Sequence, residues 1–313
     1  MKKEVVLYFH RYPRNPILKP RDWPYKVNSV MNPAAVRFDN QTIMVARVED
    51  MRGLSHFSLA RSDDGVSDWR IDAEPFMSAD TKNFPEEEWG LEDPRIMFVE
   101  AEKKFFIAYT AFSPVGPQIS LATTEDFKSV TRLGTILPPT DKNACVFPEK
   151  INGRWAILHR PYHSGTNGCQ IWISFSDDFK RWGDDKVVLR TRGGAWWDSQ
   201  RIGLGPNMIK TEQGWLVFYH GVKTAVYRTG VVLLDLENPT KVLHRSPTWI
   251  FSPEELYERV GDVPNVVFPC GVIWNKDTDA VHLYYGAADT TICLATAKMG
   301  ELMEYVLGCP GEG

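Results

Sequence analysis

The chain has 313 residues, of which 43% are hydrophobic and 24% are charged, a composition that excludes a disordered chain and indicates a globular one with a large core. Its formal net charge of −4 lacks the basic excess with which proteins neutralise nucleic-acid phosphates, so we expect no nucleic-acid partner. No apolar stretch approaches the roughly 18 residues of a membrane span, so we expect no membrane association.

The N-terminus and the cysteines indicate the compartment. The apolar run Val5–Phe9 is interrupted at once by His10 and Arg11, and no small residues of the cleavage type follow it. The five cysteines are odd in number, scattered and without the spacing of a metal site. We therefore predict a reduced, cytoplasmic protein that binds no metal.

A repeat runs along the whole chain. Five segments each begin with a proline that opens an apolar strand, namely NPAAVRF at Pro33, DPRIMFV at Pro94, FPEKI at Pro148, GPNMIKT at Pro206 and FPCGVIW at Pro269. Each is followed by a short polar turn, by a second strand rich in aromatic and β-branched residues, such as FFIAYTAF or WLVFYHGV, and by a third strand.

The repeat predicts the architecture. Five all-β units of about four strands each are typical of a five-bladed β-propeller, which closes radially and leaves only short sheet edges. We predict a single domain over residues 1–313, with blades that begin near residues 33, 94, 148, 206 and 269. Two stacked β-sandwiches are the alternative.

The propeller brings polar residues to one mouth of its axial channel. In an antiparallel hairpin the start of the first strand and the end of the second lie at the same end. A concave site with convergent polar groups is typical of ligand binding, whereas a wet, salt-bridged rim is the alternative. The residues expected at this mouth are Asn32, Arg47, Asp50, Glu92, Asp93, Tyr109, Lys142, His159, Arg160, Arg201, Tyr219, His220, Phe268, Tyr285 and Asp289.

The residue types at the mouth suggest a chemistry. Asp93, in WGLEDPRI, lies beside another carboxylate and aromatic rings, which can raise the pKa of a carboxylic acid and make it a general acid. Three cations could close around one small dianion such as phosphate, although ordinary salt bridges are the alternative. They are Lys142, Arg160 and Arg201. Aromatic residues with flat faces on which a sugar could stack are Trp89, Tyr109 and Trp196-Trp197, unless they are simply core.

The chain resembles glycoside hydrolase family 130, the mannoside phosphorylases, over nearly its full length. Matching stretches include LEDPRI, LPPTDKNACVFPEKINGRWAILHRP, WWDSQRIGLGP and YYGAADTTI. The resemblance implies a five-bladed propeller that cleaves β-mannosides with inversion, as phosphate attacks the anomeric carbon and α-mannose 1-phosphate is released. The partners are then an oligosaccharide and inorganic phosphate, which is a co-substrate, and no cofactor is needed.

The same motifs imply roles for individual residues. Asp93 in EDPR is the catalytic acid, and in part of the family its proton travels through a mannose hydroxyl. Lys142 in DKNA, Arg160 in HRP and Arg201 in QRIG bind phosphate, although related sequences commonly carry lysine at the last position. Positions implied to contact mannose are Arg47, Asp50, His220 and Asp289, to which we add Tyr109 as a substrate-binding face.

Several alternatives stay open. The linkage is β-1,2 or β-1,4, and the GLEDPRI and VEDMRGLSH segments look more like members that act on β-1,2-mannosides. A hydrolase would use two or three carboxylates, with Glu49, Glu92 and Asp289 as candidates, and a sugar-binding propeller without chemistry is the third hypothesis. The loops Pro114–Gln118 and Tyr162–Gly168 are expected to shape the aglycone side, and the oligomeric state stays open, a homo-oligomer included.

Overall fold

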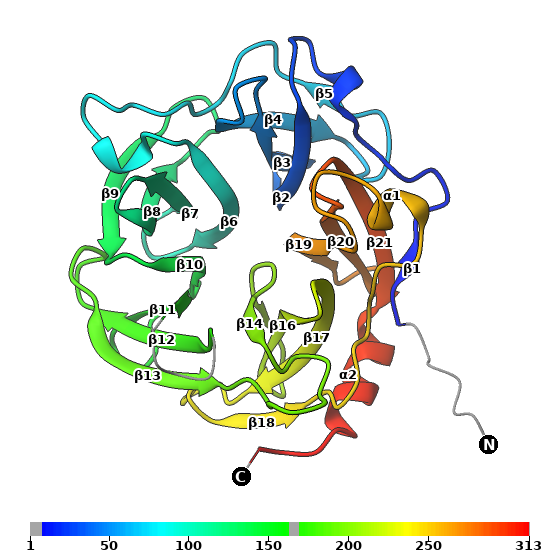
Figure 1. Cartoon of the computed structure of the whole chain (residues 1–313). Coiled ribbons are helices and arrows are strands. Elements are labelled where there is room, and N and C mark those ends of the chain that lie inside the picture. Colours follow the sequence, from blue (N-terminus) through cyan, green and yellow to red (C-terminus); the bar gives the residue numbers. More distant parts are fainter. Residues whose placement is uncertain (1–7, 163–168, 313) are drawn as a thin grey trace.

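The structure is a computed structural model that describes residues 8–162 and 169–312. Five antiparallel sheets are arranged around a central axis (Figure 1), which confirms the predicted five-bladed β-propeller. Two segments discussed above lie mostly outside the described residues, namely the N-terminal run Val5–Phe9 and the loop Tyr162–Gly168.

The strands follow one another from the axis outward in each blade. Blade 1 contains β2 (Ser29–Phe38), β3 (Gln41–Glu49), β4 (Ser55–Ser62) and β5 (Arg70–Ile71). Blade 2 contains β6 (Leu91–Val99), β7 (Lys104–Ser113), β8 (Gly116–Thr124) and β9 (Thr131–Leu137). Blade 3 contains β10 (Asp141–Val146), β11 (Trp155–Pro161), β12 (Ile171–Ser176) and β13 (Gly183–Leu189).

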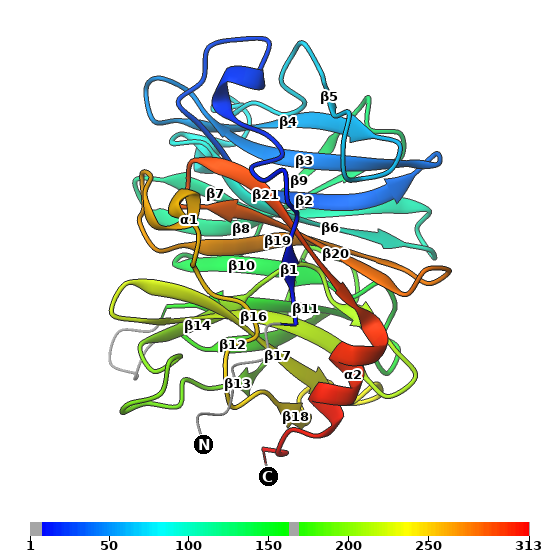
Figure 2. The same ribbon diagram turned by 90° about the vertical axis from the view of Figure 1, so that its right-hand side faces the viewer.

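The last two blades are less regular. Blade 4 contains β14 (Arg201–Leu204), β15 (Ile209–Lys210), β16 (Trp215–Lys223), β17 (Val226–Leu234) and β18 (Val242–Arg245). Blade 5 contains β19 (Val267–Asn275), β20 (Ala280–Ala287), β21 (Thr291–Lys298) and, as its outer strand, β1 (His10–Arg11). The helices are α1 (Leu256–Arg259), α2 (Met299–Leu307) and two 3₁₀ turns, Pro20–Asp22 and Pro85–Glu87. Figure 2 shows α2 at the periphery, where the chain leaves β21.

Both ends of the chain build blade 5, which closes the ring. Strand β1 pairs antiparallel with β21, so a segment before the first repeat completes the last one. Arg11 of β1 also donates from Nε and Nη2 to the two carboxylate oxygens of Glu258, each over 2.8 Å, and the Glu258 side chain is fully buried. The two-residue β1 gave no strand signal of its own in the sequence.

The inner strands of blades 3 and 4 begin earlier than predicted. They start at Asp141 and Arg201 rather than at Pro148 and Pro206. The reason is that the prolines are not equivalent, because Pro33 and Pro94 lie inside their inner strands whereas Pro148 and Pro206 follow theirs. The other three predicted openings lie within β2, β6 and β19.

The core lies between neighbouring blades, where side chains of facing sheets interdigitate. Phe57 of blade 1 meets Tyr109 of blade 2 edge-on, with ring centroids 5.8 Å apart, and Phe147 meets Trp215 of blade 4 at 5.1 Å. Large buried rings of this kind supply much of the apolar burial that holds blades together. Within the described ranges, all five cysteines are free and no helix has the length and apolarity that a membrane crossing demands.

Candidate active site

A recurrent β-bulge turns three polar side chains toward the axis. The register between the first and second strands shifts at Met31/Ala34 in blade 1, at Glu92/Arg95 in blade 2 and at Lys142/Cys145 in blade 3. A bulge re-aims the side chain that it carries, and Asn and Asp tolerate the left-handed backbone that this requires. The residues concerned are Asn32, Asp93 and Asn143, with φ of 46°, 50° and 58°.

Strand alternation decides which residues of the second strands reach the axis. Arg160 of β11 and His220 of β16 line the axial cavity, whereas the residue before each is buried away from it. Tyr109 holds that preceding position in β7, and its hydroxyl donates to Glu87 Oε1 over 2.7 Å. Tyr109 therefore does not line the cavity, and the structure does not bring it to the predicted site.

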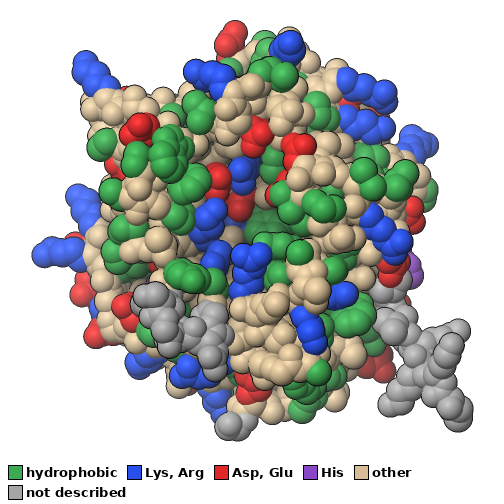
Figure 3. All heavy atoms as spheres, in the orientation of Figure 1, with side chains coloured by type: hydrophobic (Ala, Val, Ile, Leu, Met, Phe, Trp, Pro, Cys, Tyr) green, Lys and Arg blue, Asp and Glu red, His purple; other side chains and the backbone are tan. Residues whose placement is uncertain are grey.

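The axial cavity has a volume of about 310 Å³. In Figure 3 it is the central hollow of this face, with side chains of Lys, Arg, Asp and Glu around it. It is lined by Asn32, Arg47, Glu92, Asp93, Lys142, Asn143, Arg160, Arg201, His220, Tyr227, Val263, Val266, Phe268 and Asp289. Seven of the nine predicted site residues are among them, the exceptions being Asp50 and Tyr109.

Asp50 is engaged in the turn that follows β3. Its Oδ1 accepts the backbone N–H groups of Arg52 and Leu54 over 2.8 and 3.2 Å, and its Oδ2 pairs with the Arg52 guanidinium at 2.7 Å. These bonds cap the turn and hold the pKa of Asp50 below its usual value, although burial opposes them. Asp50 was predicted to contact mannose, but it does not line the cavity.

Arg47 forks between the two carboxylates of the EDPR motif. Its Nη1 donates to Asp93 Oδ1 over 3.0 Å and its Nη2 to Glu92 Oε1 over 3.1 Å. Lys142 donates from Nζ to Glu92 Oε2 over 2.8 Å, and Asn32 donates from Nδ2 to Asp93 Oδ1 over 2.8 Å. Both carboxylates are thus held by cations from neighbouring blades.

The protonation state of Asp93 differs from the prediction. Burial raises the pKa of Asp93, but the nearby charges of Arg47, Arg95 and Lys142 and the hydrogen bond from Asn32 outweigh it and lower the pKa to about 2. The expectation of a raised pKa in the free protein is therefore wrong. The sequence places a carboxylate and aromatic rings near Asp93, but the structure adds three cations.

Arg95, the last residue of EDPR, does not line the cavity but fixes the backbone around it. Its guanidinium is buried and donates to three backbone carbonyls, those of Asp93, Leu204 and Gly205, over 2.9, 3.0 and 2.9 Å. Since Leu204 belongs to blade 4, Arg95 ties the bulge of blade 2 to the opposite side of the channel. The motif thus supplies one carboxylate that lines the cavity and one arginine that fixes the backbone of that carboxylate.

Two arginines face the cavity without an acidic partner. Arg160 donates from Nε and Nη2 to Asn143 Oδ1 over 3.3 and 3.2 Å, and its Nη1 lies 2.9 Å from the sulfur of Cys169. Arg201 lies over the ring of Tyr227, 5.3 Å from its centroid. Neither has an ion pair with a carboxylate in the part of the chain that the structure describes, whereas Lys142 is paired with Glu92.

Two further groups complete the wall. Burial, with the charges of Arg160, Arg95 and Arg201, lowers the pKa of His220 well below its usual value, so the imidazole is neutral. Its Nδ1 is buried and has no hydrogen-bond partner among the described residues. Burial raises the pKa of Asp289 to about 6 despite the opposing charge of Arg47.

Sequence reasoning did not assign Asn143 or Tyr227 to the site. Asn143 could have been found, because it holds the bulge position of Asn32 and Asp93, but Ala144 rather than a proline follows it. Tyr227 lies in a third strand, where no mouth residue was expected. Over residues 8–162 and 169–312, no group of three or more His, Cys, Asp or Glu side chains is arranged to hold a metal ion.

Comparison with known proteins identifies the family. The model of glycoside hydrolase family 130, described as β-1,4-mannooligosaccharide phosphorylase, matches residues 10–307. A 1,2-β-oligomannan phosphorylase of Thermoanaerobacter sp. is 38% identical over 95% of this chain and 99% of its own. A β-1,4-mannooligosaccharide phosphorylase of Ruminococcus albus is 35% identical over 95% of this chain and 90% of its own.

A solved structure agrees with these sequence matches. The β-1,2-mannobiose phosphorylase of Listeria innocua, in complex with β-1,2-mannobiose, superposes with a TM-score of 0.87 at 30% identity and covers 95% of this chain and 99% of its own. The matches extend over the whole propeller and are not confined to one motif. The chain therefore belongs to glycoside hydrolase family 130.

Proposed function

We propose that the protein cleaves β-mannosides by inverting phosphorolysis and releases α-mannose 1-phosphate. One observation carries the proposal: Arg160 and Arg201, which have no carboxylate partner among the described residues, face the same cavity as Asp93. Unpaired arginines in a small cavity favour an anionic substrate, because their forked donors match phosphate oxygens. The phosphorylase names of the relatives at 38% and 35% identity support the same reaction.

The bond changes follow from these positions. Phosphate held by Lys142, Arg160 and Arg201 attacks the anomeric carbon, a new C1–O bond forms and the glycosidic C1–O bond breaks. Asp93 supplies the proton that the leaving oxygen needs, directly or through a mannose hydroxyl. Phosphate is already a nucleophile at neutral pH, so no second carboxylate has to activate it.

The charge balance of the cavity explains how Asp93 gains its proton. Four cations line the cavity, Arg47, Lys142, Arg160 and Arg201, against three carboxylates, Glu92, Asp93 and Asp289. A bound phosphate dianion reverses this excess of positive charge and thereby raises the pKa of Asp93, which the cations hold low in the free protein. Phosphate thus has two roles: it is the nucleophile, and its charge raises the pKa of Asp93 so that the carboxyl group can hold the proton.

The mannose ring is proposed to occupy the side of the cavity near Arg47, His220 and Asp289. Asn32 contributes there too, because its Oδ1 is buried without a hydrogen-bond partner in the described structure and can accept from a sugar hydroxyl. Relatives acting on β-1,2- and on β-1,4-linked substrates match this chain at 38% and 35% identity, so both linkages belong to the proposal. Asp50 and Tyr109 have no part in this account of the cavity.

Hydrolysis is the second candidate, and Asp289 is the residue that favours it. A carboxylate with a pKa of about 6 is suited to activate water. Glu92 is less suited, because Arg47 and Lys142 occupy its two oxygens. Glu49 does not line the cavity, and its Oε1 accepts from Asn28 over 2.9 Å.

The reverse reaction tests the proposal. With α-mannose 1-phosphate and mannose as acceptor, a phosphorylase should form mannobiose and release one inorganic phosphate per bond. A hydrolase or a binding protein should release none.

We also propose a cytoplasmic location, since phosphate and the sugar phosphate product are of use inside the cell.

A further inference from the structure

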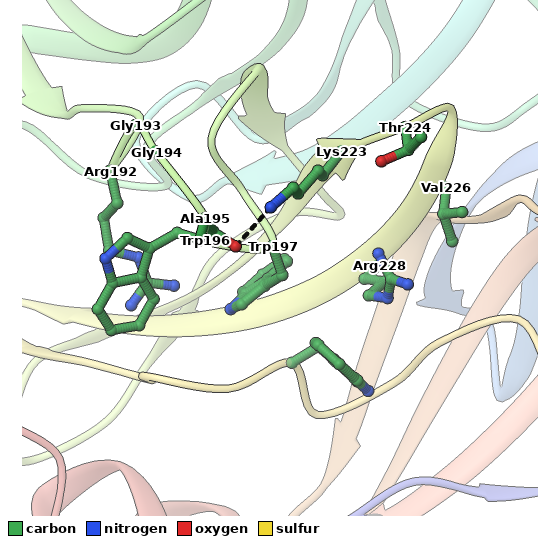
Figure 4. A pocket seen from close by; sticks show the side chains of 11 residues that line it. Arg192, Gly193, Gly194, Ala195, Trp196, Trp197, Lys223, Thr224, Val226 and Arg228 are labelled. Atoms are coloured by element: carbon green, nitrogen blue, oxygen red, sulfur yellow. Dashed lines mark hydrogen bonds between the residues drawn. The ribbon is translucent and has the colours of Figure 1, made fainter.

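A second cavity lies on blade 4, outside the axial site. Its volume is about 690 Å³, which is larger than that of the axial cavity. Figure 4 shows how three segments form it: the loop before β14, the tip of the β16–β17 hairpin and the loop after β18. The side chains on which the argument depends are Arg192, Trp196, Trp197, Lys223, Arg228 and Trp249.

The β17 strand separates the two cavities. Tyr227 lines the axial cavity, whereas its neighbours Val226 and Arg228 line the second one. Successive side chains of a strand point to opposite faces, so one strand forms a wall of both sites. The second cavity is therefore distinct from the proposed phosphate site, although it adjoins it.

Tryptophan rings form flat apolar walls in the second cavity. Trp197 is fixed, because it stacks on Tyr219 with centroids 5.6 Å apart and donates from Nε1 to Pro247 O over 3.1 Å. Trp196 is 45% exposed, and the Arg192 guanidinium lies 4.2 Å from its ring centroid. Next to it, Gly193 and Gly194 have no atom within 4 Å of the place where a Cβ would lie, so the space beside these two glycines is open.

The charge of the second cavity is one-sided. Arg192, Lys223 and Arg228 line it, and no carboxylate of the described residues does. Arg192 is neutralised by Asp198, whose oxygens lie 2.8–3.1 Å from its nitrogens, and Lys223 donates to Ala195 O over 2.6 Å.

Arg228 has no carboxylate partner and, unlike Lys223, no hydrogen bond to a backbone carbonyl among the described residues. Its Nε is buried without a hydrogen-bond partner, and no ion pair is formed by it within the described residues. Its guanidinium lies 4.6 Å from the centroid of Trp249, and burial lowers the pKa of Arg228. A partly desolvated, unpaired guanidinium is costly unless an anion satisfies it.

We propose that this second cavity binds an anionic sugar, with the sugar ring on Trp196 and Trp249 and its phosphate or carboxylate group on Arg228. Tryptophan faces suit the apolar face of a sugar ring, and the forked guanidinium suits either anion. The inference goes beyond phosphorolysis and does not depend on it.

Binding measured by calorimetry and by tryptophan fluorescence tests the inference. The probes are mannose 6-phosphate and glucuronate, with mannose and inorganic phosphate as the ring and the anion alone. All variants carry Arg160→Ala, which weakens anion binding in the axial cavity. We expect saturable binding of at least one anionic sugar, about tenfold or more weaker in Arg228→Gln. Trp196→Ala should also weaken it.

A matched control is Phe98→Ala, which removes an exposed aromatic side chain, 36% exposed, from β6 of blade 2 and from neither cavity wall, and should leave binding unchanged. Three outcomes overturn the inference: no anionic sugar binds, Arg228→Gln binds it as tightly, or Arg228→Gln weakens the binding of neutral mannose as much as that of the anionic sugars. A change of molecular mass in Arg228→Gln by light scattering, with no loss of probe binding, overturns it too and indicates an interface between copies.

Discussion

Asn32 donates a hydrogen bond to the carboxylate of Asp93 over 2.8 Å, although the two residues belong to neighbouring blades. They occupy the same position of the repeat, at left-handed φ values of 46° and 50°, and a proline follows each. Proline needs no hydrogen-bond acceptor for a backbone N–H, which suits a residue where pairing is interrupted. Repetition of one bulge therefore places a donor of one blade against the carboxylate of the next.

Asp93→Asn should abolish turnover in a folded protein. The change removes the proposed proton donor but almost no volume, so we expect the turnover number to fall by about 10²–10⁴-fold or more. Since a carboxylate with a depressed pKa stabilises the folded state above its unfolded pKa, the melting temperature should fall somewhat at pH 7. Kinetics and thermal unfolding on one preparation check both parts. Turnover close to that of the unmodified protein excludes Asp93 as the acid.

Arg160→Ala should weaken phosphate binding selectively. Loss of charge-assisted hydrogen bonds worth about 1.5–3 kcal/mol should raise the half-saturating phosphate concentration about ten- to hundredfold. The half-saturating concentration of the mannoside should change much less, and mannose 1-phosphate should bind poorly in the reverse reaction. Initial rates measured while the concentrations of both substrates are varied give the half-saturating concentrations of phosphate and of the mannoside separately.

Arg181→Ala is the matched control for Arg160, since it removes a 92% exposed arginine that pairs with Asp178 on the same blade. It should leave both concentrations unchanged. If Arg160→Ala instead lowers the melting temperature by many degrees and keeps a normal phosphate dependence, Arg160 is a structural residue.

Asp289→Asn should stabilise the protein at neutral pH but not in acid. The pKa of Asp289 is about 6 in the folded chain and about 3.9 in an unfolded one, so the folded state binds the extra proton. Ionisation of Asp289 therefore lowers the free energy of unfolding as the pH rises from about 4 to 6. The amide of Asp289→Asn does not ionise, so the variant avoids this loss of stability. We expect the variant to melt higher at pH 7.5, by about 2 °C or more, with little difference at pH 4. An equal shift at both pH values contradicts the assignment.

Glu258→Gln should loosen the closure of the ring. The buried carboxylate accepts from Arg11 and from the Tyr285 hydroxyl, the latter over 2.8 Å, and an amide cannot accept all these bonds. Removal of one partner of a buried ion pair costs about 3–5 kcal/mol, so the melting temperature should fall by roughly 6 °C or more. The exposed Glu301→Gln serves as the control and should melt normally. Equal melting of the two variants shows that Glu258 does not secure the closure.

The fold could be predicted because each blade repeats its own hydrophobic pattern. The site was predicted less completely. Tyr109 was assigned to the mouth although it lies one residue from the position that faces the axis, and a shift of one residue in a strand exchanges its two faces. Asp93 was expected to hold a proton, but its pKa depends on its distances to Arg47 and Lys142, which belong to other blades.

The second cavity was beyond prediction for a similar reason. Trp196, Arg228 and Trp249 come from three segments separated by at least 20 residues each. Trp196 was expected as a sugar-stacking face, but nothing in the sequence connected it with Arg228 or Trp249. Only the folded hairpin β16–β17 brings these segments together.

Phosphorolysis is tested most directly by incubation with β-1,2- and β-1,4-mannobiose, with and without inorganic phosphate, followed by chromatography of the products. We expect α-mannose 1-phosphate and mannose in equal amounts from at least one substrate when phosphate is present, and no cleavage without it. Release of free mannose at the same rate in the absence of phosphate, with no mannose 1-phosphate in its presence, would contradict the proposal that this cavity performs phosphorolysis.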